Sequence, residues 1–184
     1  MESRKLRVLA LTGMLAAVGY VLQLFEFPLP FLPPAASFLK FDFGDVAVVV
    51  AGSMFGPGAA VLTAIVKGLL WTLIGRGANG LVGAGMNTIA VIVFALPLVL
   101  VARSKKNWVK VGAAGVGAVA MTAVMVGLNL VVDPLYFKYP LAAVKAMIMP
   151  VIVPFNLFRG AANGVASVLV MLVLQRTAIF RTSH

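Results

Sequence analysis

The sequence contains no cysteine, and its single histidine, His184, is the last residue of the chain. Without cysteine there is no disulfide framework, no thiolate chemistry and no cysteine-ligated metal. A lone terminal histidine also removes histidine-based catalysis and histidine-clustered metal sites from consideration. We therefore expect no catalytic residues and no metal site in this protein.

Charged residues are scarce as well, at 11% of the 184 residues, and only five of them are acidic. Soluble domains contain roughly 25% charged and 45–50% apolar residues, whereas 62% of this chain is hydrophobic. Apolar runs of this length and number are typical of a polytopic membrane protein. The first run, residues 6–25, lacks an obvious small-residue cleavage site, which disfavours a secretory signal peptide.

The apolar runs divide the chain into membrane helices within one domain, residues 1–184. We predict an all-α integral membrane protein with six transmembrane helices at residues 6–25, 42–55, 59–74, 81–102, 111–132 and 150–175. Residues 26–41 contain four prolines, so they cannot form a regular helix and are expected to make an ordered cap or lid. Residues 133–146 are predicted to be a second polar, aromatic connection.

The positions of the charges predict how the chain is oriented. Of the fifteen lysines and arginines, nine lie on the side of the chain ends, and four lie on the opposite side with four of the five acids. Because cytoplasmic loops carry the excess of lysine and arginine, both termini are expected in the cytoplasm of a cell-membrane protein. The proline-rich loop is then extracytoplasmic, and the net charge of +10 reflects topology rather than nucleic-acid binding.

Two cations, Lys67 and Arg159, lie inside apolar runs and are not explained by topology. Because a guanidinium that faces lipid is costly, Arg159 is expected to face the protein interior or a wet cavity. Asn156, Arg159 and Asn163 share one face of the last helix through their i, i+3, i+7 spacing. Lys67 could instead extend its long side chain to the membrane interface.

Asn87 and Asn129 are expected at a depth similar to that of Lys67, Asn156 and Arg159, in the outer half of the membrane. Carboxamides both donate and accept hydrogen bonds, so we predict a largely apolar ligand pocket with a few polar groups at this depth. Asparagine in a membrane helix can also simply link neighbouring helices, and Asn163, one turn deeper than the others, is interpreted in that way.

Small residues suggest close helix contacts. GxxxG patterns occur at positions 52–56 and 160–164 and permit neighbouring backbones to approach. On the first helix, the face formed by Ala10, Gly13 and Ala17 has no charge to hide, so its partner could be another protein.

Several stretches resemble the substrate-binding S-component of an energy-coupling factor (ECF) transporter, most closely the riboflavin-specific branch. They are FLKFDFGD at 38–45, FGPG at 55–58, KG at 67–68, Asn87, Asn129 near a following PLYF, and PFNLFRG at 154–160. The resemblance covers nearly the whole chain. It implies a six-helix membrane subunit that binds riboflavin from outside and works with a separate transmembrane coupling protein and a pair of cytoplasmic ATPases.

The resemblance also implies roles for particular residues. Asn129, Asn156 and the cation at 159 would bond the isoalloxazine edge or the ribityl chain, and Leu39 would close over the ring. The family carries an Ala-x-x-x-Ala surface for the coupling protein on its first helix, where this chain has Ala10, Gly13 and Ala17.

Together these arguments predict riboflavin as the transported ligand, no cofactor, and ligand contacts from Leu39, Lys67, Asn87, Asn129, Asn156 and Arg159. Since riboflavin is uncharged, the two cations need other partners, for which Asp42, Asp45 or carbonyl groups are candidates. Asp42 is otherwise expected to cap the second helix.

Two alternatives remain: the same architecture with another vitamin, and a self-sufficient channel or secondary transporter. The second is disfavoured because the sequence shows no inverted repeat or paired broken helices.

Overall fold

The computed structural model describes residues 2–74 and 80–176, and it is mostly helical, as predicted. In chain order the elements are α1 (Glu2–Leu24), β1 (Phe27–Pro28), the 3-10 helix η1 (Pro34–Ala36), β2 (Lys40–Phe41), α2 (Gly44–Phe55), α3 (Pro57–Leu73), α4 (Gly80–Leu100), α5 (Asn107–Leu135), α6 (Leu141–Met147), the π-helix η2 (Ile148–Ile152) and α7 (Val153–Arg176).

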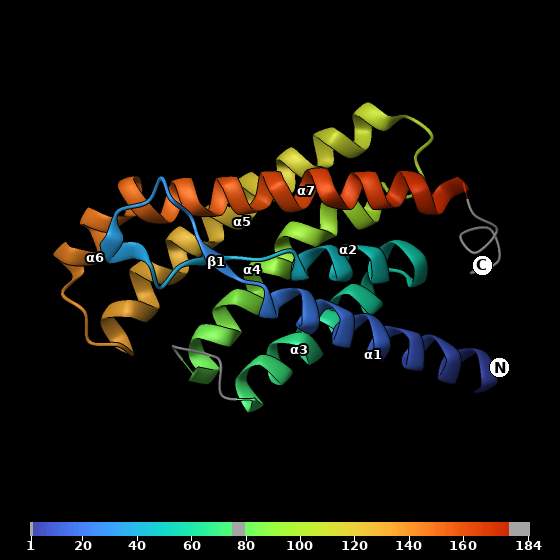
Figure 1. Cartoon of the computed structure of the whole chain (residues 1–184), viewed down its shortest axis with the longest axis horizontal. Coiled ribbons are helices and arrows are strands. Elements are labelled where there is room, and N and C mark those ends of the chain that lie inside the picture. Colours follow the sequence, from blue (N-terminus) through green and yellow to red (C-terminus); the bar gives the residue numbers. More distant parts are fainter. Residues whose placement is uncertain (1, 75–79, 177–184) are drawn as a thin grey trace.

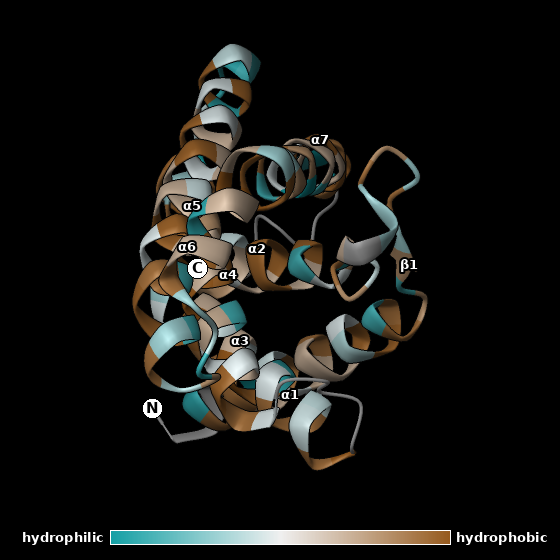
Figure 2. Cartoon of the chain, turned by 90° about the vertical axis from the view of Figure 1, so that its left-hand side faces the viewer, coloured by the Kyte–Doolittle hydropathy of each residue, from teal (hydrophilic) through white to brown (hydrophobic). Residues whose placement is uncertain are grey.

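Four of the described helical segments are long and apolar enough to cross a membrane: Lys5–Leu24, Gly80–Leu100, Asn107–Leu135 and Leu141–Arg176. The helices α2 and α3 are also apolar but shorter, with 12 and 17 residues. Large hydrophobic side chains are exposed along the long helices. In Figure 2 much of the bundle is brown, the colour of hydrophobic residues. An outer surface of this kind suits a lipid environment better than water.

The two ends of the bundle differ in what they carry. Figure 1 shows the start of α1 and the end of α7 at one end of the molecule, and the β-hairpin and α6 at the other. In the hairpin, β1 pairs antiparallel with β2, with Phe27 opposite Phe41. Phe41 also meets Phe158 of α7 edge to face at a centroid distance of 5.5 Å, so the hairpin is packed onto α7.

Residues 26–41 thus contain only two short strands and one 3-10 turn, as expected from their prolines.

The hydrophobic core lies where α4 packs against its neighbours, and small residues allow other helices of the core to approach each other closely. Phe94 and Leu98 of α4 are completely buried in a cluster that includes residues of α2, α3, α5 and α7. A methyl group added at Gly160 would lie 2.5 Å from Ala118 Cβ, and one at Gly164 would lie 2.9 Å from Ala114 Cβ. The GxxxG pattern at 160–164 therefore lets α7 pack closely on α5, which confirms its interpretation as a contact motif.

The connection predicted over residues 133–146 is wrong in extent. The helix α5 continues through Pro134 to Leu135, and α6 begins at Leu141, so the non-helical link is confined to residues 136–140. A proline removes only its own N–H from the helix ladder, which is tolerable in a last turn that is ending anyway. Around Pro150 the chain passes through the π-turn η2 directly into α7, so the last helical segment begins earlier than predicted.

Candidate ligand-binding site

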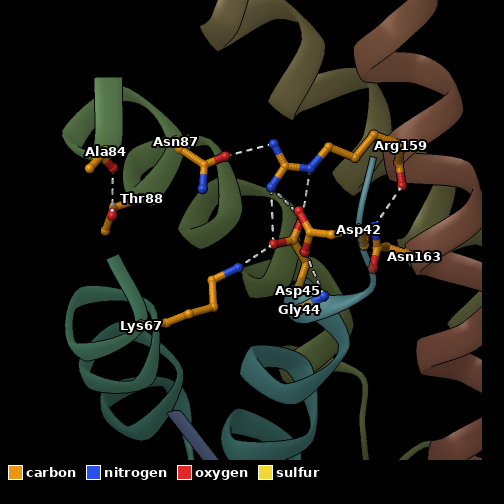
Figure 3. Close-up of polar contacts among 9 residues, drawn as sticks. All are labelled: Asp42, Gly44, Asp45, Lys67, Ala84, Asn87, Thr88, Arg159 and Asn163. Atoms are coloured by element: carbon orange, nitrogen blue, oxygen red, sulfur yellow. Dashed lines mark hydrogen bonds and ion pairs between the residues drawn. The ribbon is translucent and has the colours of Figure 1, made fainter. Parts of the chain in front are cut away.

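A buried carboxylate, Asp45, lies at the centre of the polar residues near the hairpin end of the bundle. Both of its oxygens are bound by cations: Lys67 Nζ is 2.7 Å from Oδ1, and Arg159 Nη2 is 2.8 Å from Oδ2. Arg159 Nε also donates to Oδ2 at 2.9 Å. Figure 3 shows the two cationic side chains reaching Asp45 from α3 and α7, so one carboxylate joins three helices.

The backbone leaves space for this arrangement. A methyl group added at Gly19 would lie 3.2 Å from Lys67 Cδ, and one at Gly44 would lie 3.2 Å from Lys67 Nζ. Glycine at both positions therefore allows the lysine side chain to run between α1 and the start of α2. Asp45 is in the first turn of α2, where the partial positive charge of the helix N-terminus further favours a carboxylate.

Arg159 extends the network to a fourth helix. Its Nη1 donates to Asn87 Oδ1 of α4 at 2.6 Å, while Nε and Nη2 are engaged by Asp45. The structure thus brings together three of the six predicted ligand-binding residues, Lys67, Asn87 and Arg159. The alternative in which Lys67 reaches the membrane interface is wrong, because the residue is only 1% exposed and pairs with Asp45.

Asp42 and Asn163 connect the start of α2 to α7. The Asp42 carboxylate accepts a hydrogen bond from Gly44 N at 2.7 Å, at the helix start where its capping role was expected. Asn163 Nδ2 donates to the Asp42 carbonyl at 3.0 Å and to the Arg159 carbonyl at 3.2 Å. The interpretation of Asn163 as a residue that links structural elements is therefore confirmed.

Asn156 lies one turn before Arg159 and keeps an acceptor free. Its side chain is 1% exposed, and its Nδ2 donates to the Ile152 carbonyl at 2.8 Å. Its Oδ1 has no hydrogen-bond partner among the residues that the structure describes. Because buried polar atoms are normally satisfied, this oxygen is a candidate acceptor for a ligand donor.

Asn129 and Leu39 lie outside the ion cluster. Asn129 Nδ2 donates to the Met125 carbonyl of its own helix at 2.7 Å, and the residue is partly exposed. Leu39 is partly buried against the cluster of Leu29, Phe41 and Phe155. Phe155 directly precedes Asn156, so the loop residue Leu39 packs near the part of α7 that carries Asn156 and Arg159.

Asp45 is the residue that the sequence-based ligand set omits. An aspartate in the first turn of an apolar helix resembles an ordinary capping residue, and this pattern alone hides its pairing role. The available signal was charge: two buried cations require partners, and Asp45 is one of the candidates named from that requirement. The structure selects Asp45 over Asp42 for the direct ion pairs.

Residues 7–174 match the family described as "ECF transporter, substrate-specific component". The chain belongs to this family. An S-component of this kind is a multi-pass membrane protein with a transport role, which agrees with the predicted absence of enzymatic function.

Curated relatives cover nearly the whole chain. The "Riboflavin transporter RibU" of Staphylococcus aureus (strain TCH60) is 34% identical over 91% of this chain and 88% of its own. The "Riboflavin transporter FmnP" of Bacillus subtilis (strain 168) is 33% identical over 93% of each chain.

A solved structure described as "Structure and mechanism of the S component of a bacterial ECF transporter" matches the fold of this S-component. It has a TM-score of 0.75 and 31% identity, and the match covers 93% of this chain and 96% of that chain. The similarity therefore extends over nearly the entire bundle.

Proposed function

We propose that this protein is the riboflavin-binding subunit of an ECF-type vitamin uptake transporter. The assignment of the ligand is supported by two relatives, each at least 33% identical, that are both named riboflavin transporters. The observation in this chain that carries it is Asn156, a buried carboxamide whose Oδ1 lacks a partner among the described residues, one turn from Arg159. A flavin ring edge offers an N–H donor for such an oxygen.

The proposed ligand contacts are Leu39, Lys67, Asn87, Asn129, Asn156 and Arg159. Asn156 and Asn129 would form hydrogen bonds with the polar groups of the flavin, and Leu39 would pack over the ring from the loop. Lys67 and Arg159 are already joined through Asp45, and Asn87 accepts a hydrogen bond from Arg159, so the three residues would present a preorganised set of polar groups. Preorganisation reduces the entropy lost when the ligand binds.

The direct test is to purify the protein in detergent and titrate riboflavin while following flavin fluorescence. We expect a yellow protein or strong quenching of added riboflavin. Asn156→Ala should weaken binding about tenfold or more, since it removes an acceptor in a desolvated site. Thr122→Ala, which alters a buried residue bonded to its own helix at Ala118, is the control and should leave the affinity unchanged. Unquenched riboflavin with the folded wild-type protein would refute the ligand assignment.

The partner surface is proposed to be the face of α1 formed by Ala10, Gly13 and Ala17, all of which are exposed. A methyl group added at Gly13 would meet nothing within 4 Å in the part of the chain that the structure describes. Gly13→Leu should therefore preserve riboflavin binding but block ATP-driven uptake with the coupling protein and ATPase pair. Val119→Leu, at an exposed position of α5, is the matched control. Normal uptake by Gly13→Leu would exclude this face.

We also propose six membrane-spanning helices, with both termini in the cytoplasm and the hairpin loop outside. The absence of cysteine allows single-cysteine mapping with a membrane-impermeant maleimide. Ser37→Cys, in the loop, should be labelled in intact cells, whereas Asn107→Cys, at the opposite end of the bundle, should react only after permeabilisation. The reverse pattern would invert the topology.

A further inference from the structure

Four ionisable side chains are buried together at the hairpin end of the bundle, and their formal charges cancel. Asp42 and Asp45 are 4% and 0% exposed, and Lys67 and Arg159 are 1% and 5% exposed. At neutral pH these are two negative and two positive groups. The charge bias that sets membrane orientation acts on loops that face water, and none of these four side chains faces water. That bias therefore does not explain why they are grouped.

Among the described residues, only Asp45 forms ion pairs with the two cations, and Asp42 lies next to Lys67. Asp45 binds Lys67 and Arg159 directly. A methyl group added at Gly44 would lie 2.8 Å from Asp42 Oδ1 and 3.2 Å from Lys67 Nζ, so Asp42 and Lys67 are near neighbours across that glycine. The second aspartate therefore supplies the negative charge that Asp45 alone cannot.

Each nitrogen of the Arg159 guanidinium group already makes a hydrogen bond, which engages three of its five N–H groups. Nε and Nη2 donate to the Asp45 carboxylate, and Nη1 donates to Asn87 (Figure 3). The planar fork of an arginine is the usual feature that grips a phosphate or carboxylate with two parallel hydrogen bonds. Here Asp45 already takes the edge formed by Nε and Nη2, so an anionic ligand would have to displace Asp45 to bind there.

We propose that Asp45, assisted by Asp42, makes this site select an uncharged flavin over its phosphorylated form. Asp45 neutralises and occupies Arg159 and Lys67, which leaves their immobilised donors for polar contacts without a net positive field. Asp45 is thus a positioning and specificity-determining residue, acting through Arg159 and Lys67. This inference rests on the proposed function, since it concerns which form of the vitamin the same site accepts.

The probes are riboflavin and riboflavin 5′-phosphate, which differ by one phosphate group. Affinities are measured by fluorescence quenching for the wild type, Asp45→Asn and Asp42→Asn. Each variant removes one negative charge and keeps a hydrogen-bond acceptor, and the amide oxygen introduced by Asp42→Asn can still accept from Gly44 N. We expect the affinity for the phosphate ester, relative to riboflavin, to rise about tenfold in each variant, with a dependence on ionic strength that the wild type lacks.

A double variant separates charge from structure. In Asp45→Asn with Lys67→Met, one anion and one cation are lost together, so the relative affinity should return toward that of the wild type. Asp133→Asn is the matched control, because it makes the same acid-to-amide change in α5, outside this cluster. Its ratio of affinities should equal that of the wild type.

An unchanged ratio in folded Asp45→Asn and Asp42→Asn would overturn the inference, as would a wild type that binds both probes equally. If Asp45→Asn does not fold, Asp42→Asn decides alone, because its cap to Gly44 is preserved. Failure of the proposed function looks different: the folded wild type then binds neither probe.

Discussion

Two buried lysines at opposite ends of the bundle are held in different ways. Lys67 is 1% exposed and pairs with the Asp45 carboxylate at 2.7 Å. Lys110 is 0% exposed, and its Nζ donates to the neutral Gln175 side chain at 2.7 Å. Gln175 in turn donates to the Ala102 carbonyl at 2.7 Å, so Lys110 ties α5 to the end of α7 and the α4–α5 connection.

The difference follows from where each lysine lies. Lys110 is in the first turn of α5 next to a basic connection, at the end of the bundle where the first and last helices also end. In the proposed topology a cation there is near the membrane surface, and hydrogen bonds with carboxamide groups suffice to hold it. Lys67 lies between helices far from that end, where an unpaired charge would be costly, and it is matched by a carboxylate. The buried ion pairs thus lie at the candidate site, whereas the buried lysine at the opposite end is held by a neutral side chain.

The largest expected effect is that of Asp45→Ala, which would leave two buried cations without their shared partner. Breaking a buried ion pair on one side costs about 3–5 kcal/mol, which corresponds to a fall in melting temperature of roughly 10 °C. Thermal unfolding in detergent, followed by fluorescence of Trp71 and Trp108, measures it. An unchanged melting temperature would show that the cluster does not stabilise the fold.

Lys67→Met should have a smaller effect, about 1–2 kcal/mol, because Asp45 keeps both of its hydrogen bonds to Arg159. The methionine retains most of the apolar stem of the lysine, which separates lost charge from lost packing. The same melting experiment applies. A destabilisation as large as that of Asp45→Ala would mean that Lys67, rather than Arg159, is the principal partner of Asp45.

Lys110→Met should destabilise least, by about 1 kcal/mol, because it removes one hydrogen bond to a neutral side chain. Adding Gln175→Leu removes the stranded partner as well, and a further loss then measures the bond from Gln175 to Ala102. Riboflavin affinity should be unchanged in Lys110→Met. Reduced affinity, or a loss of stability equal to that of Lys67→Met, would contradict the view that Lys110 has only a structural role and is held more weakly than Lys67.

The sequence predicted much of the polar cluster through the cost of charge in an apolar helix. Arg159 and Lys67 stood out because topology did not require them, and Asn87 because of its expected depth. Asn129 and Asn156 were placed at the same depth, yet each donates to a backbone carbonyl four residues earlier in the chain. Depth gives the position of a residue along the membrane normal but not the direction in which its side chain points. It therefore could not tell the residues that join the ion cluster from those that bond to the backbone nearby.

The sequence alone determined that this is a multi-helix membrane protein, since apolar runs bounded by charges leave few other structures. The positions of the charges along the chain also singled out the two cations that need partners. Only the tertiary structure decided that one aspartate, Asp45, serves both, because Lys67 and Arg159 lie 22 and 114 residues away from it in the chain. Pairing over such separations depends on how α2, α3 and α7 pack, and glycines at 19 and 44 make room for the lysine that completes it.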